Sequence, residues 1–151
     1  YLHGPVGRGK SALMQVFIDA LQHWNETAPP RRRCRVERHH FHAFMLDLHQ
    51  RLFALKAEGH DGGDPVARLA NALTARVDVL CFDEFHVTDV ADAMLLMPFF
   101  ARALDNGLTL IATSNFAPAD LYRNGLQRER FLPFIALLQQ RLNIVSLSGP
   151  Q

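Results

Sequence analysis

The sequence is poor in the features that mark several classes of protein. It has two cysteines in 151 residues, Cys34 and Cys81, and the second lies inside an apolar run, which argues against a disulfide framework and favours a reducing compartment. No apolar run approaches the roughly 20 residues needed to cross a bilayer, and no signal peptide leads the chain, so we expect a soluble protein. A formal charge of +1 argues against a histone-like nucleic-acid binder, and 48% hydrophobic residues argue against disorder.

The length of 151 residues fits one domain. The chain begins at Tyr1 without a methionine and reaches a glycine-rich loop within three residues. We therefore expect a fragment whose first strand begins before Tyr1.

Segments with helical and strand-like patterns alternate along the chain. The expected helices cover residues 11–24, 43–56, 65–76 and 90–105, and further helical segments fill residues 118–142. The expected strands cover residues 1–3, 35–42, 77–82, 108–112 and 144–147. Asp89 is a suitable N-cap for the fourth helix, Gly107 a suitable stop, and residues 59–64 form a glycine-rich break. Because parallel neighbours need crossover connections, this alternation predicts an α/β layered sheet.

The strongest pattern is a phosphate loop at the amino end. It satisfies G-x-x-x-x-G-K-[ST] between a strand and an amphipathic helix, with the residues Gly4, Pro5, Val6, Gly7, Arg8, Gly9, Lys10 and Ser11. Backbone N–H groups of such a loop, and the positive end of the helix, attract phosphate oxygens. Lys10, one of only two lysines beside fourteen arginines, would meet the β and γ phosphates of ATP, and the Ser11 hydroxyl would ligate Mg²⁺. The alternative is a glycine loop that only turns the chain.

Two acidic residues follow the apolar run of residues 77–82. Ligands of parallel sheets bind outside the carboxyl ends of the strands, so we expect Asp83 beside Ser11, where its carboxylate can hold Mg²⁺. Glu84 would polarise a water, as a general base, for attack on the γ phosphate. Asn115, after the next strand, would hydrogen-bond the γ phosphate or that water. The alternative is that the acids cap a loop and Asn115 is a turn residue.

Two arginines near residue 130 are candidates for an arginine finger, which stabilises charge on the transferred phosphoryl group from within or between subunits. Pro133 predicts that a short helix ends near Phe131 and that a new one begins. Arg128 and Arg130 lie about 200° apart on a helix, so both cannot serve one site. The alternative is that both are solvated or paired with Glu129.

Several of these motifs together resemble the AAA+ ATPases of the ZapE cell-division family, whose mitochondrial relatives are the lactation-elevated-type ATPases. The matching segments are residues 42–49, 83–94, 112–115 and 125–133. The resemblance implies a P-loop NTPase fold with a five-stranded parallel sheet in the order 5-1-4-3-2, flanked by helices. It assigns the phosphate loop, acidic pair and sensor to Lys10, Ser11, Asp83, Glu84 and Asn115, and it favours Arg130 over Arg128 as the finger.

The resemblance also implies Mg²⁺-dependent ATP hydrolysis and assembly of copies into a ring or hexamer. It points to a protein client, such as the tubulin-like division polymer, and to the cytoplasm at or near the division site of the inner membrane. A helical lid domain would follow the last strand, so residues 1–151 would form the ATPase core alone. Two alternatives stay open: a nucleic-acid ATPase such as a helicase loader, and a nucleotide-gated scaffold without turnover, against which Glu84 argues.

Two further clusters invite a binding function. His40 and His42 would face one way on a strand and could bind Zn²⁺, but no third ligand follows at a suitable spacing, which favours a polar strand surface. A basic cluster could attract anionic lipid or nucleic acid, although a solvated loop is favoured; its members are Arg31, Arg32, Arg33, Arg35 and Arg38.

Overall fold

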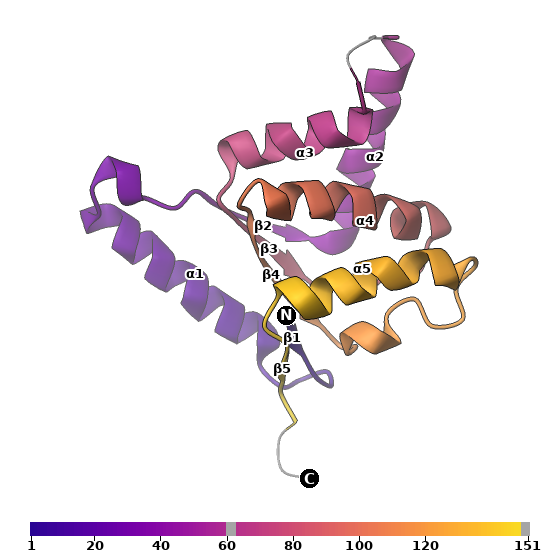
Figure 1. Cartoon of the computed structure of the whole chain (residues 1–151). Coiled ribbons are helices and arrows are strands. Elements are labelled where there is room, and N and C mark those ends of the chain that lie inside the picture. The colour runs from indigo at the N-terminus through magenta and orange to yellow at the C-terminus, as the bar shows by residue number, and fades with distance from the viewer. Residues whose placement is uncertain (60–62, 149–151) are drawn as a thin grey trace.

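A parallel β-sheet lies at the centre of the structure, a computed structural model that describes residues 1–59 and 63–148 (Figure 1). Its strands are β1 (Leu2–His3), β2 (Val36–His40), β3 (Val79–Asp83), β4 (Thr109–Ser114) and β5 (Val145–Ser146). They form a five-stranded sheet in the order β2-β3-β4-β1-β5, and each neighbouring pair is parallel. The predicted order 5-1-4-3-2 is confirmed.

Helices cover both faces of the sheet, unequally. They are α1 (Lys10–Thr27), α2 (Phe41–Ala57), α3 (Pro65–Arg76), α4 (Val90–Asp105) and α5 (Arg128–Arg141), with single 3₁₀ turns η1 (Pro30–Arg32) and η2 (Pro118–Asp120). In Figure 1, α1 lies alone on one side of the sheet, and α2 to α5 lie on the other. The structure is therefore a three-layered α/β fold.

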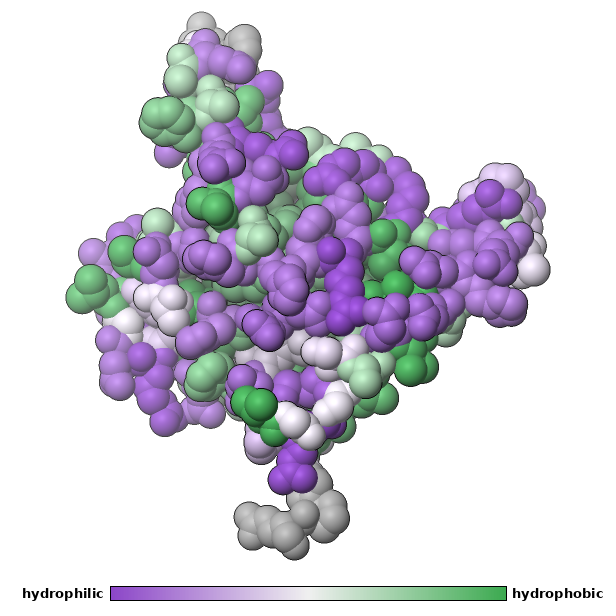
Figure 2. Space-filling model, turned by 180° about the vertical axis from the view of Figure 1, so that it is seen from behind, coloured by the Kyte–Doolittle hydropathy of each residue, from purple (hydrophilic) through white to green (hydrophobic). Residues whose placement is uncertain are grey.

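The middle strand β3 explains this layering, because all five of its residues are buried. Leu80 and Phe82 belong to the large core formed with α2 to α5, whereas Val79 and Cys81 pack with Met14 and Ile18 of α1. Alternate side chains of β3 thus enter different layers, and both layers are apolar. Seen from behind, the surface is mostly hydrophilic, with apolar residues in separate patches (Figure 2).

The ends of α3 and α4 agree with the sequence prediction, since α3 covers Pro65–Arg76 and α4 covers Val90–Asp105. Asp89 caps α4, since its side chain accepts hydrogen bonds from the backbone N–H groups of Ala91 at 2.7 Å and Asp92 at 3.3 Å. Gly107, with φ of 98°, follows the helix as expected. In the glycine-rich break at 59–64, residues 60–62 lie outside the described part of the chain.

Two predicted boundaries are wrong. β2 ends at His40 and α2 begins at Phe41, so His42 lies on a helix and does not share a strand face with His40. The reason is tertiary: Phe41 is buried against the ring of Phe85, with ring centroids 4.3 Å apart.

The second wrong boundary concerns Pro133. The proline lies inside α5, which begins at Arg128 and continues to Arg141 as one helix. Proline in a helix leaves the carbonyl four residues earlier without its backbone donor, and that residue is the exposed Glu129. Among the described helices, none combines the length and the hydropathy that a bilayer crossing requires.

Candidate functional site

The carboxyl ends of β1, β3 and β4 meet at one edge of the sheet. Leu2 is in register with Thr113, and Phe82 with Ala112, so the loops that follow these strands begin side by side. The backbone N–H of Gly4 donates to the Ser114 carbonyl at 3.1 Å and fixes the start of the glycine-rich loop against β4.

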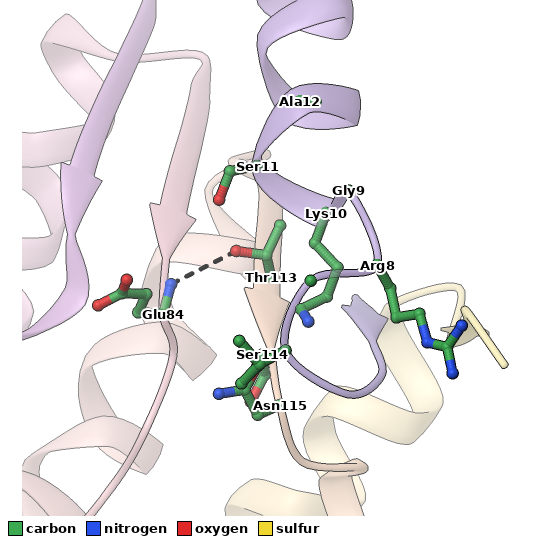
Figure 3. Close-up of a pocket in the computed structure, with 11 residues that line it drawn as sticks. Arg8, Gly9, Lys10, Ser11, Ala12, Glu84, Thr113, Ser114 and Asn115 are labelled. Atoms are coloured by element: carbon green, nitrogen blue, oxygen red, sulfur yellow. Dashed lines mark hydrogen bonds between the residues drawn. The ribbon is translucent and has the colours of Figure 1, made fainter. Parts of the chain in front are cut away.

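A cavity of about 320 Å³ opens at this edge (Figure 3). Its walls are formed by Val6, Gly7, Arg8, Gly9, Lys10, Ser11, Ala12, Glu84, Thr113, Ser114 and Asn115. Most of the predicted loop therefore shares one cavity with Glu84, which follows β3, and with Asn115, which follows β4. The remaining predicted site residues, which are Gly4, Pro5, Asp83, Arg128 and Arg130, do not line it.

The glycine-rich loop is shaped for an anion. Gly7 and Gly9 both have φ of 79°, a left-handed conformation that residues with a side chain rarely adopt. Lys10 is buried and its Nζ donates to the carbonyls of Gly4 at 2.7 Å and Pro5 at 2.8 Å. Because α1 begins at Lys10, its free backbone N–H groups add partial positive charge beside this ammonium. Figure 3 shows Lys10 reaching into the loop, whereas Arg8 points away from Glu84.

Glu84 is held in an unusual backbone conformation. Its φ is 55°, and the residue is exposed and lines the cavity. Thr113 of β4 supports this turn, because its Oγ1 accepts from the Glu84 backbone N–H at 3.4 Å (Figure 3). The Thr113 carbonyl also accepts from the Phe85 N–H at 2.8 Å. Strained backbone of this kind persists where the surroundings fix it, and it is common at functional sites.

Asp83 is buried and paired with an arginine of β2. Arg38 donates from Nε to Oδ2 at 2.5 Å and from Nη2 to Oδ1 at 3.0 Å. The same guanidinium donates to Gln15 Oε1 at 2.5 Å and lies 3.5 Å from the Ser11 carbonyl oxygen, both on α1. The hydrogen bond to Asp83 raises the pKa of Arg38 above its ordinary value, although partial burial opposes the change. Asp83 and the first turn of α1 thus meet at one guanidinium.

The prediction of a solvated basic loop is wrong for two of its arginines. Arg35 pairs with Asp78, from Nη2 to Oδ1 at 2.9 Å and from Nε to Oδ2 at 3.0 Å. Arg38 pairs with Asp83 in the same two-point manner. Both arginines therefore tie the β2 segment to β3.

The two candidate finger residues lie in different environments. The Arg128 guanidinium donates to the carbonyls of Ala119, Leu121 and Tyr122, at 2.7, 3.2 and 3.1 Å, and so fastens the preceding turn to the start of α5. Arg130 is exposed, and its Nη1 donates to the side chain of Gln127 at 2.9 Å. Its guanidinium can be offered to another molecule at the cost of one exposed hydrogen bond.

Sequence reasoning did not identify the roles of Thr113 and Arg38. Thr113 directly precedes Ser114 and Asn115 at the predicted end of a strand. Its hydroxyl was the feature of the sequence that could have indicated a hydrogen bond to the neighbouring strand end. Arg38 was grouped with loop arginines, although a charged residue within a strand suggests a nearby counter-charge. Its partner lies 45 residues away and could not be read from local spacing.

Comparison with known proteins decides the family. A sequence model of AFG1-like ATPases matches residues 1–151. The chain belongs to the AFG1-like ATPase family. Membership implies nucleotide binding, which agrees with the loop and cavity at the sheet edge.

Relatives of this AFG1-like ATPase occur in bacteria and animals. The cell division protein ZapE of Escherichia coli is 44% identical over 149 residues, which cover 99% of this chain and 36% of that protein. Lactation elevated protein 1 homolog B of Danio rerio is 40% identical over 154 residues, which cover 97% of this chain and 29% of that protein. The chain thus spans about a third of the length of the curated relatives it matches.

Solved structures resemble the AFG1-like fold at low sequence identity. The crystal structure of DnaI has a TM-score of 0.67 at 17% identity, covering 99% of this chain and 70% of that one. DnaA from Aquifex aeolicus, bound to AMPPCP, has a TM-score of 0.56 at 17% identity, covering 96% and 38%. At 17% identity, these similarities show that the chain shares the fold of DnaI and DnaA.

Proposed function

We propose that this AFG1-like ATPase binds ATP at the cavity between the glycine-rich loop and β4, and hydrolyses it. Lys10 and the N–H groups at the start of α1 would bind the β and γ phosphates. Glu84 would accept a proton from the attacking water, and Asn115 would orient that water or the γ phosphate. Each of these residues lines the same cavity.

The residues suited to Mg²⁺ are Ser11 and Asp83. A hydroxyl and a carboxylate are hard oxygen donors of the kind Mg²⁺ prefers, and one guanidinium contacts both the Asp83 carboxylate and the backbone of Ser11. When bound, Mg²⁺ would neutralise charge that develops on the β and γ phosphate oxygens. The role of Ser11 and Asp83 is to orient that ion beside the loop.

The position of Glu84 is the observation that carries the proposal for turnover. Glu84 lines the cavity and is exposed, its backbone is fixed in a left-handed turn by Thr113, and its carboxylate lies on the side away from Lys10 in Figure 3, so a rotamer change would bring it to the γ phosphate. This backbone conformation costs a residue with a Cβ about 1–2 kcal/mol, and the structure keeps it at the edge of the cavity. A site that only binds ATP has no need of a carboxylate held in this way.

We further propose that copies of the protein assemble and that Arg130 completes a neighbouring site. Arg130 is exposed and has an exposed side chain as its hydrogen-bond acceptor, whereas Arg128 fastens the turn at three carbonyls. An arginine supplied in trans would link hydrolysis to assembly into a ring.

The partner we propose is a protein, acted on in the cytoplasm at or near a division site. This rests on the similarity to a protein named for cell division, of which the chain covers 36%. Fold similarity to DnaI, at 17% identity, carries no argument for a nucleic-acid partner.

Phosphate release tests these proposals. We would measure ATP hydrolysis by the protein alone, with a tubulin-like division polymer, and with single-stranded DNA. We expect hydrolysis in the absence of DNA and an increase with the polymer. Stimulation by DNA alone would favour a helicase-loader function, and tight ATP binding without phosphate release would favour a nucleotide-gated scaffold.

A further inference from the structure

The Arg38 guanidinium lies where a cation is expected to act during hydrolysis. It occupies both oxygens of Asp83, at 2.5 and 3.0 Å, and the side chains of this pair are 28% and 8% exposed. A buried carboxylate needs a counter-charge, and Arg38 supplies one without any metal.

The pair also joins three elements of the fold. Arg38 comes from β2, Asp83 ends β3, and the guanidinium reaches Gln15 at 2.5 Å and the Ser11 carbonyl at 3.5 Å on α1. Ser11 begins the helix that follows the glycine-rich loop. Arg38 therefore contacts both the Asp83 carboxylate and the backbone of Ser11, the two residues proposed to hold Mg²⁺.

We propose that Arg38 is a resident cation that competes with Mg²⁺ for Asp83 and so sets the concentration of Mg²⁺ at which nucleotide binds tightly. This inference rests on the proposed nucleotide site. Without Mg²⁺, Arg38 holds the Asp83 carboxylate through two hydrogen bonds. With Mg²⁺ and nucleotide, Arg38 gives up at least one of its two hydrogen bonds to the carboxylate.

Competition follows from charge and from geometry. Two cations held at one carboxylate repel each other, and burial reduces the screening by water. Mg²⁺ also demands near-octahedral coordination at about 2.0–2.1 Å, which leaves little freedom for a bidentate guanidinium on the same two oxygens. The planar fork of arginine holds both oxygens at once, which the point charge of a lysine cannot do.

The chain provides a matched control at the other end of the same strands. Arg35 holds Asp78 through the same two-point geometry, at 2.9 and 3.0 Å, and both side chains are more exposed, at 53% and 39%. Neither residue lines the cavity at the sheet edge. A substitution there removes an arginine–aspartate pair between the same two segments without touching the proposed metal ligand.

The test is a Mg²⁺ titration with a fixed amount of a fluorescent ATP analogue, in which binding is recorded as fluorescence anisotropy. We expect Arg38→Gln to lower the Mg²⁺ concentration at half-saturation by about tenfold, a ratio that corresponds to about 1.4 kcal/mol. Arg38→Lys should lower it by less, about threefold, because it keeps the charge but loses the two-point contact. Arg35→Gln should leave the midpoint unchanged.

An unchanged or higher midpoint in Arg38→Gln would overturn the proposal, since it would mean that Arg38 does not compete with the metal. An equal fall in Arg38→Lys would overturn the part assigned to charge. If the wild-type protein fails to bind the analogue at any Mg²⁺ concentration, the proposed nucleotide site itself is wrong, which is a different result.

A second measurement needs no substitution at the site and remains available if Arg38→Gln does not fold. In a nuclear magnetic resonance spectrum of arginine Nε–H groups of the wild-type protein, the Arg38 signal should shift on addition of Mg²⁺ with a non-hydrolysable ATP analogue, because the two-point contact with Asp83 is broken. The Arg35 signal should stay in place. An Arg38 signal that moves no more than that of Arg35 would contradict the proposal.

Discussion

The left-handed backbone of Glu84 predicts that catalysis and stability can be separated at this residue. Its φ of 55° costs a residue with a Cβ about 1–2 kcal/mol. Glycine adopts this conformation freely, but it loses about 0.5–1 kcal/mol more in chain entropy on folding. The exposed side chain contributes little packing. Glu84→Gly should therefore stabilise the fold by about 0.5–1 kcal/mol, even though it removes the proposed base.

Glu84→Gln is the matched control, because it keeps the Cβ and the strain and removes only the negative charge. Its stability should stay within about 0.5 kcal/mol of the wild type, as is usual for exposed substitutions. Both variants should bind the fluorescent ATP analogue, because the loop and Lys10 are untouched. Both should release phosphate at least about 100-fold more slowly, the lower end of what a general base contributes.

Urea unfolding and phosphate release measure the two effects on the same samples. For a chain of this length, the gain in Glu84→Gly corresponds to a rise in Tm of about 1–4 °C. A Glu84→Gly protein less stable than Glu84→Gln would refute the argument from backbone strain. Hydrolysis by Glu84→Gln at the wild-type rate would refute the assignment of the base.

Three other predictions address the loop, the finger and the turn before α5. Lys10→Ala should weaken binding of the fluorescent ATP analogue by about 10- to 100-fold, because it removes a charged donor to phosphate, and undiminished binding would count against the site. If Arg130 acts in trans, a mixture of Arg130→Ala and Lys10→Ala protomers should recover some hydrolysis that neither has alone; no recovery at any ratio would indicate a role within one subunit. Gly125→Ala should lower stability by about 1–3 kcal/mol, because a Cβ there would lie 2.3 Å from the Tyr122 ring, and an unchanged Tm would contradict this packing argument.

Sequence reasoning succeeded where local chemistry decides the structure. The residues that bound α4 are an N-cap, Asp89, and a glycine that stops the helix, Gly107, and both act within a few residues of themselves. The meeting of the glycine-rich loop with Glu84 also followed, because parallel strands place their carboxyl ends on one edge.

Two of the failures involve partners distant in sequence. His42 lies on a helix because Phe41 packs against Phe85, which is 44 positions further along the chain. The strand-like alternation of residues 35–42 could not predict that contact. The pairing of Arg38 with Asp83 depends on the register of β2 against β3, in which Arg38 lies opposite Cys81. The spacing of charges along the sequence instead placed Arg38 in one basic cluster with the neighbouring arginines.

The two borders of the sheet affect how copies of this protein can associate. β2 forms one border with the sequence Val-Glu-Arg-His-His, and β5 forms the other with two residues only. Ionic side chains and very short outer strands both discourage another chain from extending a sheet by backbone pairing. Self-assembly would then have to use side chains and loops, and the β content measured by circular dichroism should be the same in monomers and in assembled particles.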